Sequence, residues 1–247
     1  MPEKGAFFQL GSGDDALKVW RSRESSATIV AESTELVIPE LRSLFFKLVN
    51  DISIPVHWSW TNIYYSQKQS GLIRHWDNHE NFIIGLNGVK RFQIAPNNCV
   101  KYPEQNADNL NPHVSGFEKE IEKERLADTL PGMIEIDVGP GEGVFIPRGW
   151  WHEAFALEQN TVTLTWAVWS YAWRNLFEAG QVTPTDHISE LTLRTPLSLD
   201  HNEIPEEAAK ILPNSNLANM IRAQAELGSL YKLLSSYNKA QERNSSE

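Results

Sequence analysis

The central part of the chain alternates apolar and polar residues in short runs separated by turn residues. Such runs are typical of antiparallel strands rather than of repeating βαβ units. The pattern predicts eight strands, at residues 57–66, 70–77, 81–87, 89–95, 132–138, 142–147, 151–157 and 161–170. Between the third and the fourth strand, Asn87-Gly88 is a strong signal for a two-residue hairpin. Together these strands predict an all-β core folded as a double-sheet jelly roll.

The N-terminal part has a different pattern. Two short apolar runs, 6–10 and 17–20, flank a turn rich in Gly and Asp and predict strand, turn and strand. From Ser33 the apolar residues recur at helical spacing as far as Asn50-Asp51, and Pro39 fits the start of this helix. We therefore divide the chain into supporting strands and a helix at 1–56, a jelly-roll core at 57–173 and a helical extension at 174–247.

The helical extension is predicted to contain a helix at 204–212 and a longer helix capped by Asn214 or Ser215. One face of the longer helix is mostly apolar, with Leu217, Met220, Ile221, Leu227, Leu230 and Leu234. This face must be buried, either against the protein's own domain or in a homodimer. We predict a homodimer, because the stripe is longer than a small jelly roll needs for its own core.

A long insertion, 97–131, separates the fourth and fifth predicted strands. It is rich in Asn and Pro at first and then charged from Glu118 to Arg125, which predicts a short solvated helix. Loops of this length serve as substrate lids in some proteins and have no such role in others. The sequence leaves both interpretations open.

Composition narrows the class of protein. A chain of 247 residues, 41% of them hydrophobic, is long enough for one full-sized core. The net charge of −10 and the scattered Lys and Arg residues argue against binding to nucleic acid, and an acidic surface either favours a cationic substrate or simply maintains solubility. The single cysteine, Cys99, excludes an intrachain disulfide and a multi-thiolate metal site. Without a leader pattern or a membrane-length apolar run, we expect a cytoplasmic protein that does not enter a membrane.

A candidate metal site begins at His75-Trp76-Asp77. If residues 73–77 form a strand, His75 and Asp77 point to the same face and Trp76 points away. A second histidine, His152, follows much later in the chain and is predicted to lie on a neighbouring strand. Two histidines and one carboxylate on one face of a metal ion are the ligand set of non-haem Fe(II) oxygenases.

The segment before the second histidine carries a recognisable motif. The spacing G-x5-P-x-G-x2-H is met by Gly141, Pro147, Gly149 and His152. With the segments 75–82 and 88–92, this part of the chain resembles the cupin-like, JmjC-type Fe(II)- and 2-oxoglutarate-dependent oxygenases. It is most similar to the branch of asparaginyl hydroxylases and ribosomal-protein hydroxylases. The resemblance covers about 60–169 and implies a double-stranded β-helix fold.

The resemblance also implies roles for individual residues. His75, Asp77 and His152 would bind Fe(II), and Lys90 would pair with the far carboxylate of the cosubstrate 2-oxoglutarate. The residue pattern agrees for Lys90, because it shares an inward face with Phe92 and Ile94. A lysine between apolar residues needs an anion to offset the cost of desolvation.

Further residues are expected in the cosubstrate pocket. The resemblance places Asn81 and Trp169 near the metal and the cosubstrate, and Thr163 and Thr165 share the face of Trp169 by strand alternation. We expect one of the two threonines to bind the cosubstrate. The family often has Thr three residues before the first iron ligand, where this chain has Leu72. We assign the missing hydroxyl to Tyr64.

Several other residues have a simpler explanation. His79 and Glu80 are alternatives to Asp77 as a ligand, but Glu80 has the wrong strand parity. Arg148 is expected to be structural. The histidines without a motif are expected to be structural or exposed: His57, His113, His187 and His201. Four tryptophans are expected around the mouth of the barrel: Trp58, Trp60, Trp150 and Trp151.

The sequence thus predicts an Fe(II)- and 2-oxoglutarate-dependent dioxygenase that uses O2 to hydroxylate a C–H bond and releases succinate and CO2. We expect the substrate to be a peptide or protein side chain, with a free amino acid or a natural-product intermediate as the second choice. A cupin domain that binds a metal without oxygenase activity is the alternative from another class. Lys90 argues against that alternative, because a metal-binding or isomerase domain has no need of a lysine at this spacing.

Overall fold

The computed structural model describes residues 27–51, 56–107, 117–169, 172 and 174–175. The chain divides into two compact units, Met1–Arg42 with Trp60–Trp169, and Ser43–Ser59 with Ser170–Glu247. The jelly roll belongs to the first unit. The strands predicted at 6–10 and 17–20, the two C-terminal helices and the homodimer predicted from them lie outside the described residues.

The predicted strands are present, and each of their ends lies within two residues of the prediction. The strands are β1 (Thr28–Ala31), β2 (Ser59–Ser66), β3 (Gly71–His75), β4 (Glu80–Asn87), β5 (Lys90–Ala95), β6 (Ile134–Val138), β7 (Gly143–Ile146), β8 (Trp151–Ala156) and β9 (Thr161–Val168). The sequence did not predict β1, which extends one sheet by pairing with β2. The helical segments are η1 (Thr34–Leu36), α2 (Pro39–Asp51), η2 (Val56–Trp58) and α3 (Glu118–Leu126). The predicted start of α2 at Pro39 is confirmed.

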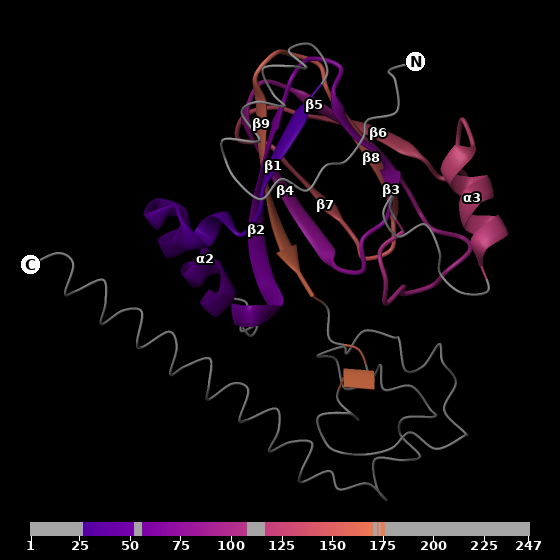
Figure 1. The fold of residues 1–247 in the computed structure, drawn as a ribbon, viewed down its shortest axis with the longest axis horizontal. Helices are drawn as coiled ribbons and strands as arrows, with labels where there is room; N and C mark the ends of the chain where they lie inside the picture. Colours follow the sequence, from indigo (N-terminus) through magenta and orange to yellow (C-terminus); the bar gives the residue numbers. More distant parts are fainter. Residues whose placement is uncertain (1–26, 52–55, 108–116, 170–171, 173, 176–247) are drawn as a thin grey trace, which may run out of the picture. The chain divides into compact units, whose positions relative to one another are not determined.

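The strands form two sheets, in the orders β1-β2-β9-β4-β7 and β3-β8-β5-β6 (Figure 1). Apart from β1, the pairing is nested: β2 lies beside β9, β3 beside β8, β4 beside β7, and β5 beside β6. The first strand thus pairs with the last, and pairing proceeds inward to the middle of the chain. This nested antiparallel order is that of a jelly roll, which confirms the predicted fold class.

The hairpin predicted at Asn87-Gly88 is wrong. β4 belongs to the five-stranded sheet and β5 to the four-stranded sheet, so the turn carries the chain between sheets. Gly88 has a φ of 64°, and a Cβ there would lie 2.7 Å from the Thr161 hydroxyl oxygen at the start of β9. The glycine therefore marks a tight turn, as predicted, but a local turn does not decide which strands pair.

Two apolar clusters stabilise the barrel on opposite faces of the four-stranded sheet. The inner cluster lies between the sheets and contains Ile83, Phe92, Ile94, Val138, Ile146 and Ala154. The outer cluster contains Trp76, Ala95, Val100, Ala107, Ile121, Leu130 and Trp151. Most of the outer residues outside the strands come from the 97–131 insertion, so its described residues form a core behind the sheet. The helix predicted there is confirmed as α3, although Ile121 is buried rather than solvated.

Polar contacts fix α3 to the back of the sheet. The Arg74 side chain donates to the backbone carbonyls of Glu124 and Ala127 and pairs with Glu153 on β8 at 2.5 Å. The Trp151 indole N–H donates to the Glu124 carboxylate at 2.5 Å. Trp151 therefore anchors the insertion, and its predicted place at the mouth of the barrel is wrong.

Neither α2 nor α3, the α-helices among the described residues, combines the length and the apolar character that crossing a membrane requires.

Two glycines of the β6–β8 region offer a matched test of local packing. Gly141 and Gly149 both have a φ of 80°, and a Cβ at Gly149 would lie 2.4 Å from Cδ of Pro103, whereas a Cβ at Gly141 would meet nothing within 4 Å. We expect Gly141→Ala to lower the free energy of unfolding by about 1–2 kcal/mol, from the left-handed backbone alone. Gly149→Ala should cost more, because Pro103 must also move. Urea unfolding measures both, and equal losses would contradict the packing argument.

Candidate metal centre

Two neighbouring strands bring the candidate ligands together. His75 is the last residue of β3 and lies opposite His152 on β8, and Asp77 follows two residues after the strand ends. The ring centroids of the two histidines are 4.1 Å apart, and His152 Nε2 lies 3.4 Å from Asp77 Oδ2. One potential ligand atom from each of the three residues lies within 4.8 Å of the others. The structure thus assembles the three residues that the sequence proposed.

Backbone carbonyls orient both imidazoles. His75 Nδ1 lies 2.7 Å from the carbonyl oxygen of Ile73, and His152 Nδ1 lies 3.0 Å from that of Trp150. A carbonyl oxygen only accepts, so Nδ1 must carry the hydrogen in each ring. The lone pair of the neutral imidazole is then on Nε2, which is the usual arrangement of metal-binding histidines.

The Asp77 carboxylate is ionised in this environment. Burial alone would raise its pKa, but the hydrogen bond from His152 and the charges of His75 and His79 hold the pKa of Asp77 well below its ordinary value. Burial would lower the pKa of His152, and the Asp77 carboxylate reverses this and raises it. Without a metal, Asp77 and a protonated His152 therefore stabilise each other, and a divalent cation would replace the proton.

A side-chain amide positions the Asp77 carboxylate. The Asn81 Nδ2 donates a hydrogen bond to Asp77 Oδ2 at 2.7 Å, and Asn81 is 3% exposed. The prediction that Asn81 lies near the metal site agrees with this contact. The sequence did not reveal its hydrogen bond to the aspartate, because the bond depends on the turn between β3 and β4.

The loops that carry the ligands are tied together through their backbones. The Gly149 N–H donates to the Asp77 carbonyl oxygen at 2.8 Å, and the Arg148 N–H donates to the Glu80 carboxylate at 2.6 Å. Glu80 is thus used as a structural acceptor, and it is not part of the metal-binding group found among the described residues. His79 is not part of that group either, and its Nε2 lies 3.8 Å from Asp77 Oδ2.

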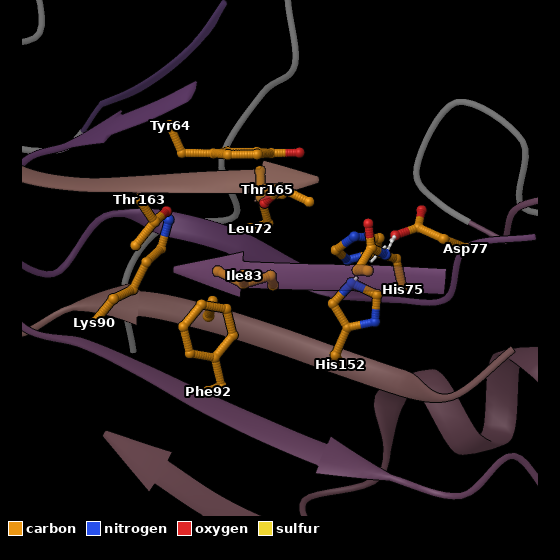
Figure 2. A pocket seen from close by; sticks show the side chains of 12 residues that line it. Tyr64, Leu72, His75, Asp77, Ile83, Lys90, Phe92, His152, Thr163 and Thr165 are labelled. Atoms are coloured by element: carbon orange, nitrogen blue, oxygen red, sulfur yellow. Dashed lines mark hydrogen bonds and ion pairs between the residues drawn. The ribbon is translucent and has the colours of Figure 1, made fainter. Parts of the chain in front are cut away.

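A pocket of about 380 Å³, counting its open mouth, extends from the metal site into the barrel. It is lined by Tyr64, Leu72, His75, Asp77, Asn81, Ile83, Lys90, Phe92, His152, Ala154, Thr163 and Thr165. Figure 2 shows the two histidines and the aspartate at one end, Lys90 at the other, and Ile83 and Phe92 between them. No described residue of the 97–131 insertion lines this pocket, which argues against a lid formed by those residues.

Lys90 is buried, with 2% of its surface exposed. Burial lowers the pKa of Lys90 to about 8. Its Nζ donates to the Ser66 hydroxyl at 3.3 Å and lies 5.1 Å from the centroid of the Tyr64 ring. Among the described residues, no carboxylate forms an ion pair with it. A buried ammonium group without a counter-ion is costly, so this end of the pocket favours an anionic ligand.

The other predicted pocket residues divide into two groups. Tyr64, Thr163 and Thr165 line the pocket, as expected. Burial and the nearby Asp77 raise the pKa of the Tyr64 hydroxyl, so it remains a hydrogen-bond donor. Trp169 is not among the lining residues: it is 49% exposed, and its ring lies 6.1 Å from that of Trp60. Sequence reasoning missed Ser66, which strand alternation from Tyr64 would have placed on the same face.

Arg148 has the structural role that the sequence predicted. Its guanidinium donates to the Tyr102 carbonyl oxygen at 3.0 Å and lies over the Tyr102 ring at 5.9 Å. Both contacts connect the loop before His152 to the first part of the insertion. The side chain therefore supports the ligand-bearing loop from the insertion side.

A jelly roll with two histidines and an aspartate converging at one end of its pocket defines a cupin-type barrel. The family model of the cupin-like domain matches residues 21–177, and the chain belongs to this family. It is 26% identical over 206 residues to the uncharacterized protein YxbC of Bacillus subtilis (strain 168). This match covers 82% of the chain, which spans only 61% of the length of YxbC.

Solved structures are similar at a lower level. YcfD, a ribosomal oxygenase from Escherichia coli in complex with cobalt and 2-oxoglutarate, is 15% identical with a TM-score of 0.47, covering 83% of this chain and 52% of YcfD. An X-ray structure of YcfD from E. coli is 17% identical with a TM-score of 0.46, covering 91% of this chain and 56% of YcfD. KdgF from Halomonas sp. is 11% identical with a TM-score of 0.29, covering 48% of this chain and 74% of KdgF. Because these identities and TM-scores are low, none of the three structures is evidence for what this protein binds or does.

The contact between Asn81 and Asp77 generates a prediction about metal affinity. Asn81→Ala removes a hydrogen bond that orients a ligand, and loss of such a bond typically weakens metal binding by about 10–100-fold. We expect a rise of this size in the Kd for Mn(II), measured by electron paramagnetic resonance titration. Asn87→Ala is the matched control, because Asn87 lies on the same strand and also donates at 2.7 Å, to the Asn160 carbonyl oxygen. Unchanged Mn(II) binding by Asn81→Ala would mean that other contacts position Asp77.

Proposed function

We propose that the protein is an Fe(II)- and 2-oxoglutarate-dependent oxygenase that hydroxylates a C–H bond of a peptide or protein side chain. The cosubstrate would be converted to succinate and CO2. The observation that supports this proposal is the combination of two features in one pocket. His75, Asp77 and His152 converge at one end, and the buried, unpaired ammonium of Lys90 lies at the other (Figure 2).

The donor set fits iron. Two imidazole nitrogens and one carboxylate oxygen on one side of the ion suit Fe(II) and leave three coordination positions for other ligands. Both histidines would present Nε2 to the metal, because Nδ1 is bound to a carbonyl oxygen in each ring and the cation would displace the proton of His152. When bound, the iron would supply the redox chemistry with O2 that these side chains lack.

The far end of the pocket fits the second carboxylate of 2-oxoglutarate. Protonated Lys90 would pair with this carboxylate and thereby regain the counter-ion that burial denies it. Tyr64 and Thr163 line the pocket as hydroxyl donors, and we propose Tyr64 as the replacement for the hydroxyl missing at Leu72. Ile83 and Phe92 would exclude water from the middle of the pocket, which strengthens the ion pair.

The non-oxygenase alternative lacks an explanation for Lys90. A cupin domain that only binds a metal would use His75, Asp77 and His152 but would leave the cost of burying Lys90 without a benefit. The acceptor is proposed from the family resemblance, and a free amino acid or a natural-product intermediate is the second choice.

Turnover tests the reaction class and the ligand set together. The unmodified protein with Fe(II), 2-oxoglutarate, O2 and a cell lysate should form succinate, and mass spectrometry should detect acceptors that gain one oxygen atom. His75→Ala and His152→Ala should lose both iron binding and succinate formation, because the two remaining ligands cannot compete with water. Asp77→Gly should abolish most turnover while leaving the fold intact.

Two results would count against this assignment. Absence of succinate together with absence of thermal stabilisation by Fe(II) and 2-oxoglutarate would favour the non-oxygenase domain. Full metal binding by His75→Ala or His152→Ala would mean that another side chain, such as His79, belongs to the ligand set.

Lys90→Ala should raise the KM for 2-oxoglutarate with little change in metal affinity. Stranding a buried carboxylate without its partner typically costs about 3–5 kcal/mol, which corresponds to at least a hundredfold rise in KM. Lys68→Ala is the control, because Lys68 is exposed. Steady-state kinetics with varied 2-oxoglutarate measures the effect.

The pH dependence gives a second check on Lys90. With a pKa of about 8 in the ligand-free protein, Lys90 is protonated below that pH and loses its charge above it. The affinity for 2-oxoglutarate should therefore fall as pH rises through 8 in the unmodified protein and not in Lys90→Ala. An unchanged KM for 2-oxoglutarate in Lys90→Ala would mean that another cation pairs with the carboxylate. Of the other cations, Arg91 is already paired with Asp137 at 2.6 Å, and Arg148 contacts Tyr102.

A further inference from the structure

Three aromatic rings meet beside the candidate metal centre. The ring centroids of Trp60 and Trp169 are 6.1 Å apart and their planes are at 89°, and the His79 ring contacts Trp60 at 4.8 Å. Perpendicular indoles form two walls of a corner. We call Trp60 and Trp169 the aromatic corner, and the His79 ring packs against Trp60.

Strand alternation places the aromatic corner in line with the pocket. On β2, Tyr64 lines the pocket, and Trp60 lies four residues earlier on the same face. On β9, Thr165 lines the pocket, and Trp169 lies four residues later, just beyond the strand and on the same face by alternation. β2 and β9 are neighbours, and the hydrogen bond from Tyr65 to Asn160 places the end of β2 beside the start of β9, so both rows run from the lysine end past the pocket to the same rim.

The rim with the aromatic corner is the metal end of the barrel. His79, which contacts Trp60, lies 3.8 Å from Asp77 through its Nε2. A side chain bound at the corner would therefore lie at the metal end of the barrel, near His79. The cosubstrate would occupy the pocket between the metal site and Lys90, and neither tryptophan of the corner lines that pocket.

The Trp169 indole is available to a ligand, and Trp60 is partly exposed. Trp169 is 49% exposed, which is unusual for a tryptophan in a folded domain. In the described part of the chain, the cations that lie over aromatic rings are Lys90 over Tyr64 and Arg148 over Tyr102. Neither tryptophan of the corner is covered by a Lys or Arg of this chain in those contacts.

The charge around the aromatic corner favours a cation. The chain segments that carry the corner and its support, 59–62, 76–80 and 166–169, contain no Lys or Arg; of their two carboxylates, Asp77 is assigned to the metal and Glu80 is the other. The whole chain has a net charge of −10. Indole faces attract cations through the negative potential of the ring, and tryptophan does so most strongly among the aromatic side chains.

We propose that the aromatic corner binds a cationic side chain, a guanidinium or an ammonium group, of the peptide substrate. This proposal rests on the proposed oxygenase function and specifies its substrate class. The cation would rest against the indole faces of Trp60 and Trp169, and a neighbouring C–H bond would then be presented to the metal. Trp60 and Trp169 are thus substrate-binding residues that select for positive charge.

The test uses the α-N-acetyl amides of arginine, citrulline and norleucine as probes. Citrulline has the shape of arginine without its charge, and norleucine tests apolar binding alone. Binding to the full-length, 15N-labelled protein loaded with Zn(II) and 2-oxoglutarate is followed through the tryptophan indole N–H resonances. We expect arginine to bind about two- to fivefold more tightly than citrulline, as a cation–π contact on exposed rings implies.

Variants locate the binding. Trp60→Leu should reduce arginine binding to the level of citrulline, and Trp60→Phe should restore part of the difference because a ring is retained. Phe145→Leu is the matched control: Phe145 is also 49% exposed, but it contacts Phe82 on the outer face of the five-stranded sheet. Its removal should leave arginine binding unchanged.

Three outcomes would overturn the proposal: equal binding of arginine and citrulline, binding of norleucine as tight as that of arginine, or arginine binding that survives Trp60→Leu. Thermal stabilisation of the unmodified protein by Zn(II) and 2-oxoglutarate is measured on the same samples. Thermal stabilisation without selectivity for arginine would reject only the cation site. Absence of thermal stabilisation would reject the proposed function.

Discussion

The pairing of β3 with β8 is the constraint on which the site depends. This pairing places His75 directly opposite His152, so that two histidines far apart in the chain share one side of the barrel. A slip of one residue would turn one histidine to the outer face, because side chains alternate along a strand. The register is secured from outside by the contact between Trp76 and Trp151, whose ring centroids are 4.4 Å apart. Each tryptophan is next in sequence to a ligand, so the outer core sets the position of the inner site.

The alternation of side chains along the strands also separates the residues that stabilise the fold from the residues that form the pocket. Behind the sheet, the insertion packs around Trp76 and Trp151 and supplies apolar burial that a small barrel would otherwise lack. Inside, the sheet presents polar residues that cost free energy to bury, above all Lys90. The outer cluster thus offsets the cost of the polar pocket.

The sequence predicted the strands well and proposed three candidate ligands that the structure brings together, because both depend on local patterns. Strand alternation predicted that His75 and Asp77 share one face and Trp76 the other, although β3 ends at His75 and Asp77 lies two residues beyond it. The wrong predictions concern which elements contact each other. Asn87-Gly88 specifies a turn, but the pairing of β4 depends on β7 and β9, which are distant in the chain. Likewise, Trp151 could not be assigned to the outer core without knowing that the insertion folds over it.

The pocket has opposite charges at its two ends. At one end, an ionised Asp77 would repel the carboxylate of any ligand unless a cation lies between them. At the other end, Lys90 has no described counter-ion and attracts a carboxylate. On the proposed function, a ligand with carboxylates at both ends would therefore fit only when a metal ion occupies the histidine and aspartate site. The arrangement would then favour a dicarboxylate bound together with a metal over the dicarboxylate alone, which would distinguish the pocket from that of a barrel with ligands for a metal only.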